Sequence, residues 1–287
     1  MKKKKLVCNL KTGITLSELK ELLKDLKDYD GDAELIIAPP YPFINMINSP
    51  IKKASQDISV YNDSYAVGEV TGNILKSINT DYVIVGHSDR HLRFSETEYD
   101  YIKKITNALE NDLNVIFCVG ESREQKLRRK TLMVLEREIA RVFNKLEGNL
   151  ENIIIAYEPT WAISNNKSDF DSINVSEISE TIIFIKKLVK DYYNLDIEVL
   201  YGGSVNSKNI DLYRNLKSDG LLVGQASLNA ESIKRIVSKM WFRQEMRLFD
   251  IFLLYLTIYF LVFCLYFLYN EFACSNYGKG RKIWKRK

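Results

Sequence analysis

Histidine and cysteine are scarce in this chain, which has 2 histidines and 4 cysteines among its 287 residues. The cysteines are Cys8, Cys118, Cys264 and Cys274, and no two of them form a CxxC pair. With so few histidines, the sequence holds no pattern for a zinc cluster, and no metal site is expected. Cys8 and Cys118 lie in apolar runs typical of strands, which predicts buried thiols and fits a reduced, cytoplasmic setting.

The main part of the chain also lacks an excess of basic charge. The formal net charge is +4, but from Trp241 onward 8 Lys and Arg residues stand against 3 Asp and Glu residues, a local charge of +5. Residues 1–240 therefore carry about −1. Without a broad positive field, no nucleic-acid partner is expected. The basic run at 2–5 leads into only a few apolar residues, so no secretory signal is expected either.

A long hydrophobic run occurs only near the C-terminus. Residues 251–269 read IFLLYLTIYFLVFCLYFLY, 19 residues without a charge and about the length of a helix that crosses a bilayer. The sequence therefore predicts a transmembrane helix at 251–269, in a tail of residues 241–287 that follows a domain of residues 1–240. Basic residues flank the run on both sides and leave its orientation open. The alternative is an accidental extension of the chain that is neither folded nor used.

Strand-like and helix-like segments alternate through residues 1–240. The apolar residues of the clearest helix, from Ile178 to Val189, fall on one face. Eight strands with intervening helices or connections match the α/β class and the size of a (β/α)8 TIM barrel. A doubly wound open sheet is the alternative, but the first strand is followed by KTG, without the glycine-rich turn of that fold. The predicted strands are 6–10, 34–38, 53–55, 82–85, 115–119, 153–157, 198–201 and 220–223, and the clearest predicted helices are 16–26, 96–109, 131–146 and 176–192.

Chemically useful side chains follow several of the predicted strands, at the ends that would meet at one mouth of a barrel. Asn9 and Lys11 end the first strand, two residues apart, so both can point the same way. His87 follows the fourth strand and Glu158 the sixth. A glutamate can remove a carbon-bound proton, a neutral histidine can donate to a carbonyl oxygen, and a lysine adds positive charge. Taken alone, His87 is equally consistent with a histidine that bonds a backbone carbonyl.

Glycine turns follow the last two predicted strands. Gly202 and Gly203 come after the seventh strand, and Gly224 comes after the eighth. Glycines at these places in a barrel let backbone N–H groups approach a phosphate closely. A glycine pair alone is usually only a turn, but turns after both late strands favour a phosphate site. The site thus combines proton transfer with anion binding, and no activated serine or cysteine supports hydrolysis.

Six motifs occur together in a fixed order over residues 5–240, and they resemble the triosephosphate isomerase family. They are NLK at 9–11, VGHSDR at 85–90, CVGE at 118–121, AYEPTWAI at 156–163, YGGSV at 201–205 and SDGLLVGQASL at 218–228. The resemblance implies interconversion of dihydroxyacetone phosphate and D-glyceraldehyde 3-phosphate through an enediolate, a step of glycolysis and gluconeogenesis. It also implies a homodimer and no cofactor.

The resemblance assigns roles to residues by position. Glu158 is expected to be the base, His87 the electrophile and Lys11 an electrostatic anchor, while Asn9 bonds the substrate. The lid is expected at 159–167, and the loop at 65–69 is expected to reach the partner's site in the dimer. The backbone amides expected to hold the phosphate are those of Ser164, Ser204, Gly224 and Gln225.

Four departures from the family's usual pattern bear on the predicted roles, while Leu10 in place of an aromatic residue is a minor packing change. Asp89 stands in place of a glutamate, and its shorter carboxylate is expected to reach Lys11 less well. The lid tip at 164–166 reads SNN in place of glycines around a threonine. Gln225 replaces a second glycine, so its side chain should point away from the phosphate. Val67 replaces a threonine in the dimer loop.

Three further residues are expected to have structural roles. His91 is interpreted as a surface or cap residue, Glu121 as a partner for nearby N–H groups, and Trp161 as lid packing. Two other functions remain open from sequence. The tail and the altered lid are consistent with a membrane-tethered scaffold on an isomerase fold. The phosphate turns are consistent with a sugar-phosphate epimerase, although such enzymes use other acid–base pairs.

Overall fold

The computed structural model describes residues 3–63, 65–163, 174–240, 256–257 and 259–260. The chain divides into two compact units, Met1–Trp241 and Phe242–Lys287. The transmembrane helix predicted at 251–269 lies almost wholly outside the described residues. Within the described ranges, no helix combines the length and the hydropathy needed to span a bilayer.

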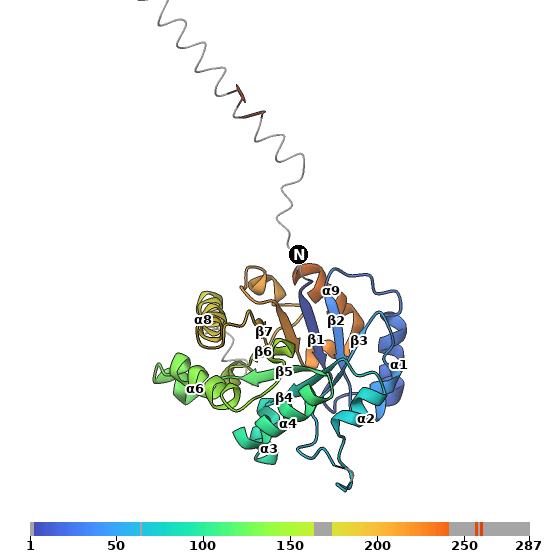
Figure 1. Ribbon diagram of the computed structural model, residues 1–287. Coiled ribbons are helices and arrows are strands. Elements are labelled where there is room, and N and C mark those ends of the chain that lie inside the picture. The colour runs from blue at the N-terminus through green and yellow to red at the C-terminus, as the bar shows by residue number, and fades with distance from the viewer. Residues whose placement is uncertain (1–2, 64, 164–173, 241–255, 258, 261–287) are drawn as a thin grey trace, which may run out of the picture. The chain divides into compact units, whose positions relative to one another are not determined.

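Eight parallel strands close into a barrel in chain order, which confirms the predicted TIM-barrel architecture (Figure 1). Each strand pairs with its neighbours in sequence, and the last closes on the first, with Cys8 opposite both Ile37 and Val223. Short strands rich in apolar and β-branched residues suit such a sheet, because both of its faces are covered. The strands are β1 (Lys5–Asn9), β2 (Glu34–Ala38), β3 (Lys52–Ser55), β4 (Tyr82–Val85), β5 (Asn114–Val119), β6 (Ile153–Tyr157), β7 (Glu198–Tyr201) and β8 (Gly220–Val223).

The helices surround the barrel (Figure 1). All four helices predicted from periodicity are present, with ends shifted by no more than a few residues. A short helix before the second of these was not predicted, and the left-handed residue Ser95 at its C-terminus separates the two. The helices are α1 (Leu16–Asp25), α2 (Gly72–Ser77), α3 (Ser88–Phe94), α4 (Glu98–Glu110), α5 (Arg123–Leu127), α6 (Thr131–Phe143), α7 (Thr160–Ile163), α8 (Val175–Tyr193) and α9 (Ala230–Met240), with 3-10 turns η1 (Tyr41–Met46), η2 (Leu150–Asn152), η4 (Ile210–Tyr213) and η5 (Gln225–Leu228).

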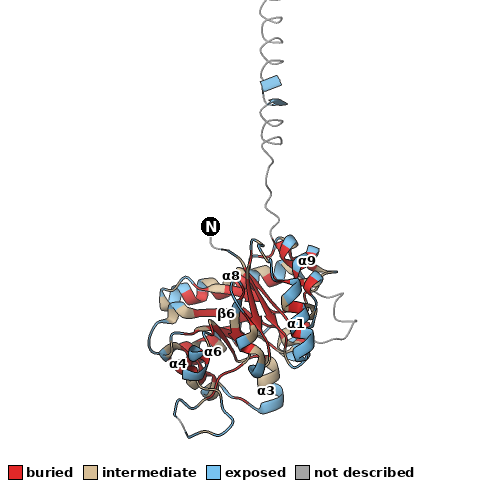
Figure 2. Ribbon diagram, turned by 90° about the vertical axis from the view of Figure 1, so that its right-hand side faces the viewer, coloured by how far each residue is buried: buried red, intermediate tan, exposed pale blue. Residues whose placement is uncertain are grey.

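The buried core forms two layers because side chains alternate along each strand. One layer fills the barrel and includes Val7, Ile36 and Cys118. The other lies between strands and helices and includes Cys8 and the buried face of α8, among them Ile182. Figure 2 shows buried strands and helices exposed on their outer faces. Both cysteines described, Cys8 and Cys118, are free and buried, as predicted.

A half-buried carboxylate, that of Glu138, connects α6 to the end of β5. Glu138 Oε2 accepts a hydrogen bond from the backbone N–H of Gly120 at 3.1 Å. Burial raises the pKa of Glu138 to about 7, the hydrogen bond from Gly120 lowers it, and the charges of Glu121 and Glu98 raise it further while Arg141 opposes them. Glu138 therefore holds its proton in the folded chain at a pH where the unfolded chain has lost it.

We predict that Glu138→Gln removes a pH dependence of stability. The pKa of Glu138 is raised on folding, so its contribution is fully present below its ordinary value of 4.5 and is lost as pH rises towards about 7. The free energy of unfolding of the parent protein should therefore fall relative to that of Glu138→Gln across this window, by at most about 3 kcal/mol. Urea denaturation of both proteins at matched concentration across the window measures the difference. A difference that stays constant with pH would contradict the assignment.

Candidate active site

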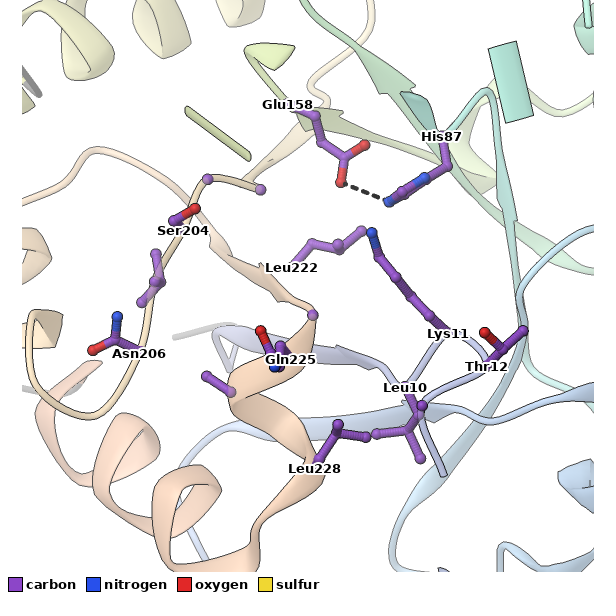
Figure 3. Close-up of a pocket in the computed structure, with 16 residues that line it drawn as sticks. Leu10, Lys11, Thr12, His87, Glu158, Ser204, Asn206, Leu222, Gln225 and Leu228 are labelled. Carbon is purple, nitrogen blue, oxygen red and sulfur yellow. Dashed lines mark ion pairs between the residues drawn. The ribbon is translucent and has the colours of Figure 1, made fainter. Parts of the chain in front are cut away.

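One pocket of about 650 Å³ opens at the C-terminal ends of the strands. It brings together most of the side chains singled out from the sequence, although they come from distant parts of the chain (Figure 3). Asn9 is buried beside this pocket but does not line it, and Ser164 lies outside the described residues. The predicted site residues that do line the pocket are Lys11, His87, Glu158, Ser204, Gly224 and Gln225.

His87 is held in a defined tautomer at the start of α3. The preceding residue, Gly86, turns the chain out of β4 with a φ of 79°, a conformation that favours glycine. His87 then caps α3, and its Nδ1 accepts a hydrogen bond from the backbone N–H of Asp89 at 3.1 Å. Because Nδ1 accepts, the ring is neutral and its proton is on Nε2. The side chain thus directs an N–H donor towards Glu158 and the pocket (Figure 3).

Glu158 directly follows β6 and is 3% exposed. Its backbone N–H donates to the carbonyl of Val119 at 2.8 Å, and its Oε1 lies 3.7 Å from His87 Nε2. That separation is too long for a hydrogen bond. Within the described residues, its Oε2 is buried without a hydrogen-bond partner. A Cβ at Gly202 would lie 2.5 Å from Cγ of Glu158, so only glycine fits under this carboxylate. The carboxylate is therefore desolvated and has an oxygen available as a base.

Lys11 lines the pocket with a backbone conformation that was not predicted from the sequence. β1 ends at Asn9, and Lys11 adopts a left-handed conformation with a φ of 49°. Its backbone N–H donates to Asn9 Oδ1 at 3.2 Å, and Gln56 Nε2 donates to its carbonyl at 2.8 Å. Asn9 and Lys11 do not lie together on the strand, because β1 ends at Asn9 and Lys11 lies in the turn that follows it. Asn9 instead supports the backbone of Lys11.

Asp89 reaches Lys11 despite its short side chain. Lys11 Nζ lies 2.7 Å from Asp89 Oδ2, so the expected weakening of this contact does not occur. Burial by itself would raise the pKa of Asp89, but the hydrogen bond and charge of Lys11 hold it below its ordinary value of 3.8. Both side chains are more than a third exposed, so the pair fixes the direction of the ammonium more than it stabilises the fold.

The glycine turns form the opposite side of the pocket, with apolar walls from Leu10, Leu222 and Leu228. Ser204 makes two contacts with one carbonyl: its backbone N–H and its Oγ donate to Ala162 at 3.1 and 2.6 Å. The amide expected to hold a phosphate is therefore already engaged by α7. Gln225 is exposed where it lines the pocket.

Asn206 also lines the pocket, although it was not predicted from the sequence. Its Oδ1 accepts from the backbone N–H groups of Lys208 and Asn209, at 2.8 and 3.1 Å, and so shapes the turn after β7. A half-buried amide that supports a turn has no distinctive spacing in a sequence, although Asn is favoured in turns generally.

The three structural roles assigned to other residues are consistent with the contacts observed. Glu121 is fully buried and accepts from Trp161 Nε1 at 2.9 Å and from the Tyr157 hydroxyl at 3.1 Å. Trp161 packs in α7 behind the site, away from the pocket lining. His91 is exposed and its Nδ1 lies 3.0 Å from the carbonyl of Glu96. Among the described residues, no group of three or more His, Cys, Asp or Glu side chains is placed to hold a metal.

Comparison with known proteins identifies the family of this chain. The sequence model of triosephosphate isomerase matches residues 4–240. The chain is 31% identical over 252 residues to a triosephosphate isomerase of Alkaliphilus oremlandii, covering 83% of this chain and 100% of that protein. It is 35% identical over 243 residues to one of Clostridium botulinum (80% and 96%) and 34% identical over 248 residues to one of Mesomycoplasma hyopneumoniae (82% and 98%). The chain belongs to the triosephosphate isomerase family.

Proposed function

We propose that this pocket interconverts dihydroxyacetone phosphate and D-glyceraldehyde 3-phosphate, with Glu158 as the base and His87 as the electrophile. One observation carries the assignment of roles: a desolvated carboxylate lies 3.7 Å from an Nε2–H donor in a pocket bounded by two glycine turns. The activity itself rests on family membership and on the names of the relatives.

In the proposed reaction Glu158 acts twice, first as a base at C1 and then as an acid at C2. Glu158 removes a proton from C1 of dihydroxyacetone phosphate, and the electron pair of that bond forms the C1–C2 double bond of the enediolate. Negative charge moves to the carbonyl oxygen on C2, where His87 Nε2–H donates a hydrogen bond and Lys11 supplies positive charge. The proton on Glu158 is then returned to C2. His87 gives its Nε2 proton to the oxygen on C2, which becomes the hydroxyl, and takes the hydroxyl proton of O1 as the C1 carbonyl forms. No net atom or electron is gained or lost.

The phosphate is proposed to bind at the glycine turns, through the amides of Ser204, Gly224 and Gln225, with Ser164 as the fourth. Because Ser204 N–H donates to the carbonyl of Ala162, phosphate binding competes with that bond. The lid is proposed at 159–167, of which residues 164–167 lie outside the described part of the chain.

A second copy of the chain is the proposed partner. The expected dimer loop at 65–69 projects two apolar side chains, with Tyr65 88% and Val67 99% exposed. Leu92 and Phe94 of α3 are 71% and 61% exposed, beside the His87 turn. Large apolar side chains with this exposure favour a protein interface. A homodimer would place the loop of one copy near the site of the other, with Val67 in place of a hydroxyl.

The tail is proposed to anchor a cytoplasmic barrel to a membrane. Residues 251–269 contain no charged residue, and basic residues gather after them. Free buried thiols at Cys8 and Cys118 favour a reducing compartment for the barrel. No structural observation favours the non-catalytic scaffold or the epimerase, because the acid–base pair and the pocket are intact.

We predict that Glu158→Gln and His87→Gln each lower kcat/KM by about a hundredfold or more, because each removes a proton-transfer group. The chain provides a matched control in its other histidine. His91→Gln lies four residues away and outside the substrate pocket, and it should leave kcat/KM within about twofold of the parent. Steady-state assays in both directions measure the effect. Equal losses in His87→Gln and His91→Gln would point to damage of the α3 turn and against an electrophilic His87.

We predict that the full-length chain sediments with membranes and is released by detergent but not by salt or alkaline wash.

We also predict that light scattering of the detergent-extracted protein gives a protein mass of twice 33.3 kDa, that of a dimer. Val67→Asp introduces a charge at the proposed interface and should shift that mass towards the monomer. Recovery in the supernatant would contradict the anchor, and a monomer in the parent protein would contradict the dimer.

A further inference from the structure

Lys126 in α5 contacts the two described segments that flank residues 164–173. Its Nζ lies 2.8 Å from Oε1 of Glu177, in the first turn of α8. It also lies 4.2 Å from the centroid of the Trp161 ring, in α7. A cation over a tryptophan face is attracted by the ring electrons, and indole is the strongest side-chain partner of this kind. One ammonium thus joins α7 to α8.

Trp161 is in turn connected to the backbone that follows Glu158, because both bond to Glu121. Its ring is 7% exposed, with Nε1 bonded to Glu121 Oε1 at 2.9 Å. The backbone N–H of Thr160 also donates to Glu121, at the carbonyl and 3.1 Å. Glu121 and Lys126 therefore fix Trp161 from different sides, and the chain directly after the base is fixed with it.

The backbone at Lys126 is itself fixed by hydrogen bonds in the first turn of α5. Ser122 and Gln125 form a capping box at the start of α5, with backbone-to-side-chain bonds of 2.7 and 3.2 Å. The backbone N–H of Lys126 donates to the carbonyl of Ser122 at 3.0 Å. The Lys126 side chain is 25% exposed and that of Glu177 is 48% exposed, so the ion pair alone is weak. Trp161 is 7% exposed, so the contact with its ring is less screened by solvent than the ion pair.

We propose that Lys126 is a positioning residue for the isomerase reaction, which holds Trp161, and through it the backbone after Glu158, in the geometry used for proton transfer. The inference rests on the proposed role of Glu158. Lys126 does not line the substrate pocket and does not touch the reacting atoms. Its loss should therefore reduce turnover without changing substrate affinity, because a smaller fraction of the enzyme holds the base in place.

The test compares Lys126→Met, Lys126→Arg and Lys190→Met. Methionine keeps an apolar stem but removes the charge, whereas arginine restores both the ion pair and the contact with indole. Lys190 forms a matched ion pair with Asp196, also at 2.8 Å, elsewhere on α8. Lys126→Met should lower kcat about three- to tenfold with KM changed less than about twofold. Lys126→Arg should recover most of the loss, and Lys190→Met should behave as the parent.

Tryptophan fluorescence reports directly on Trp161, through which Lys126 is proposed to act. The chain has 3 tryptophans, so Trp241→Phe and Trp284→Phe leave Trp161 as the reporter. In that background Lys126→Met should increase acrylamide quenching of Trp161, and Lys126→Arg should not. A normal kcat, unchanged quenching, or an equal fall in Lys190→Met would each overturn the proposal. If the parent protein shows no isomerase activity, the proposed function fails, and unchanged quenching would still reject contact between Lys126 and Trp161.

Discussion

A buried carboxylate facing a neutral imidazole is the constraint on which the rest of the site depends. Glu158 is 3% exposed, has an oxygen without a hydrogen-bond partner in the described part of the chain, and lies 3.7 Å from His87 Nε2. A desolvated carboxylate is costly unless the surrounding structure holds it in place. The glycine beneath it at position 202 and the bond from its own backbone to Val119 provide that hold. The same isolation leaves the carboxylate ready to accept a proton.

The barrel makes this arrangement possible because it brings the ends of eight parallel strands to one mouth. The proposed base, electrophile and anchor follow β6, β4 and β1, and the glycine turns follow β7 and β8. Contacts between neighbouring loops support the backbone around Glu158. Glu121 holds Trp161, and Glu138 holds the backbone of Gly120. The site is thus supported by contacts between loops as well as by the strands.

Much of this structure could be predicted from the sequence, because periodicity and strand-end motifs are local signals. The alternating pattern located all eight strands, most of them as apolar runs, and the residues after them supplied the catalytic candidates. The helix α3 was missed because its end depends on one left-handed residue, Ser95. The reach of Asp89 was underestimated because the left-handed turn at Lys11 has no signature in a non-glycine residue.

Contacts between distant loops could not be predicted at all. Ser204 and Ala162 are 42 residues apart, and Lys126 and Glu177 are 51 apart. Neither pair follows from spacing, since both depend on how loops of the closed barrel pack side by side. Asn206 likewise gave no signal, because its role is to support a turn. The opposite holds for the tail. Its sequence predicts a membrane helix, but the residues concerned lie mostly outside the described ones.

The most direct test of the central claim follows hydrogen at the substrate carbon. The parent protein is incubated with dihydroxyacetone phosphate in D2O, and the recovered substrate and product are examined by NMR. Proton transfer by Glu158 predicts deuterium at C1 of dihydroxyacetone phosphate and at C2 of glyceraldehyde 3-phosphate, because a carboxylate exchanges its proton with solvent. Glu158→Gln should show neither. Product formed at the full rate without any deuterium on carbon would contradict the account, because the hydrogen would then have moved directly between carbons.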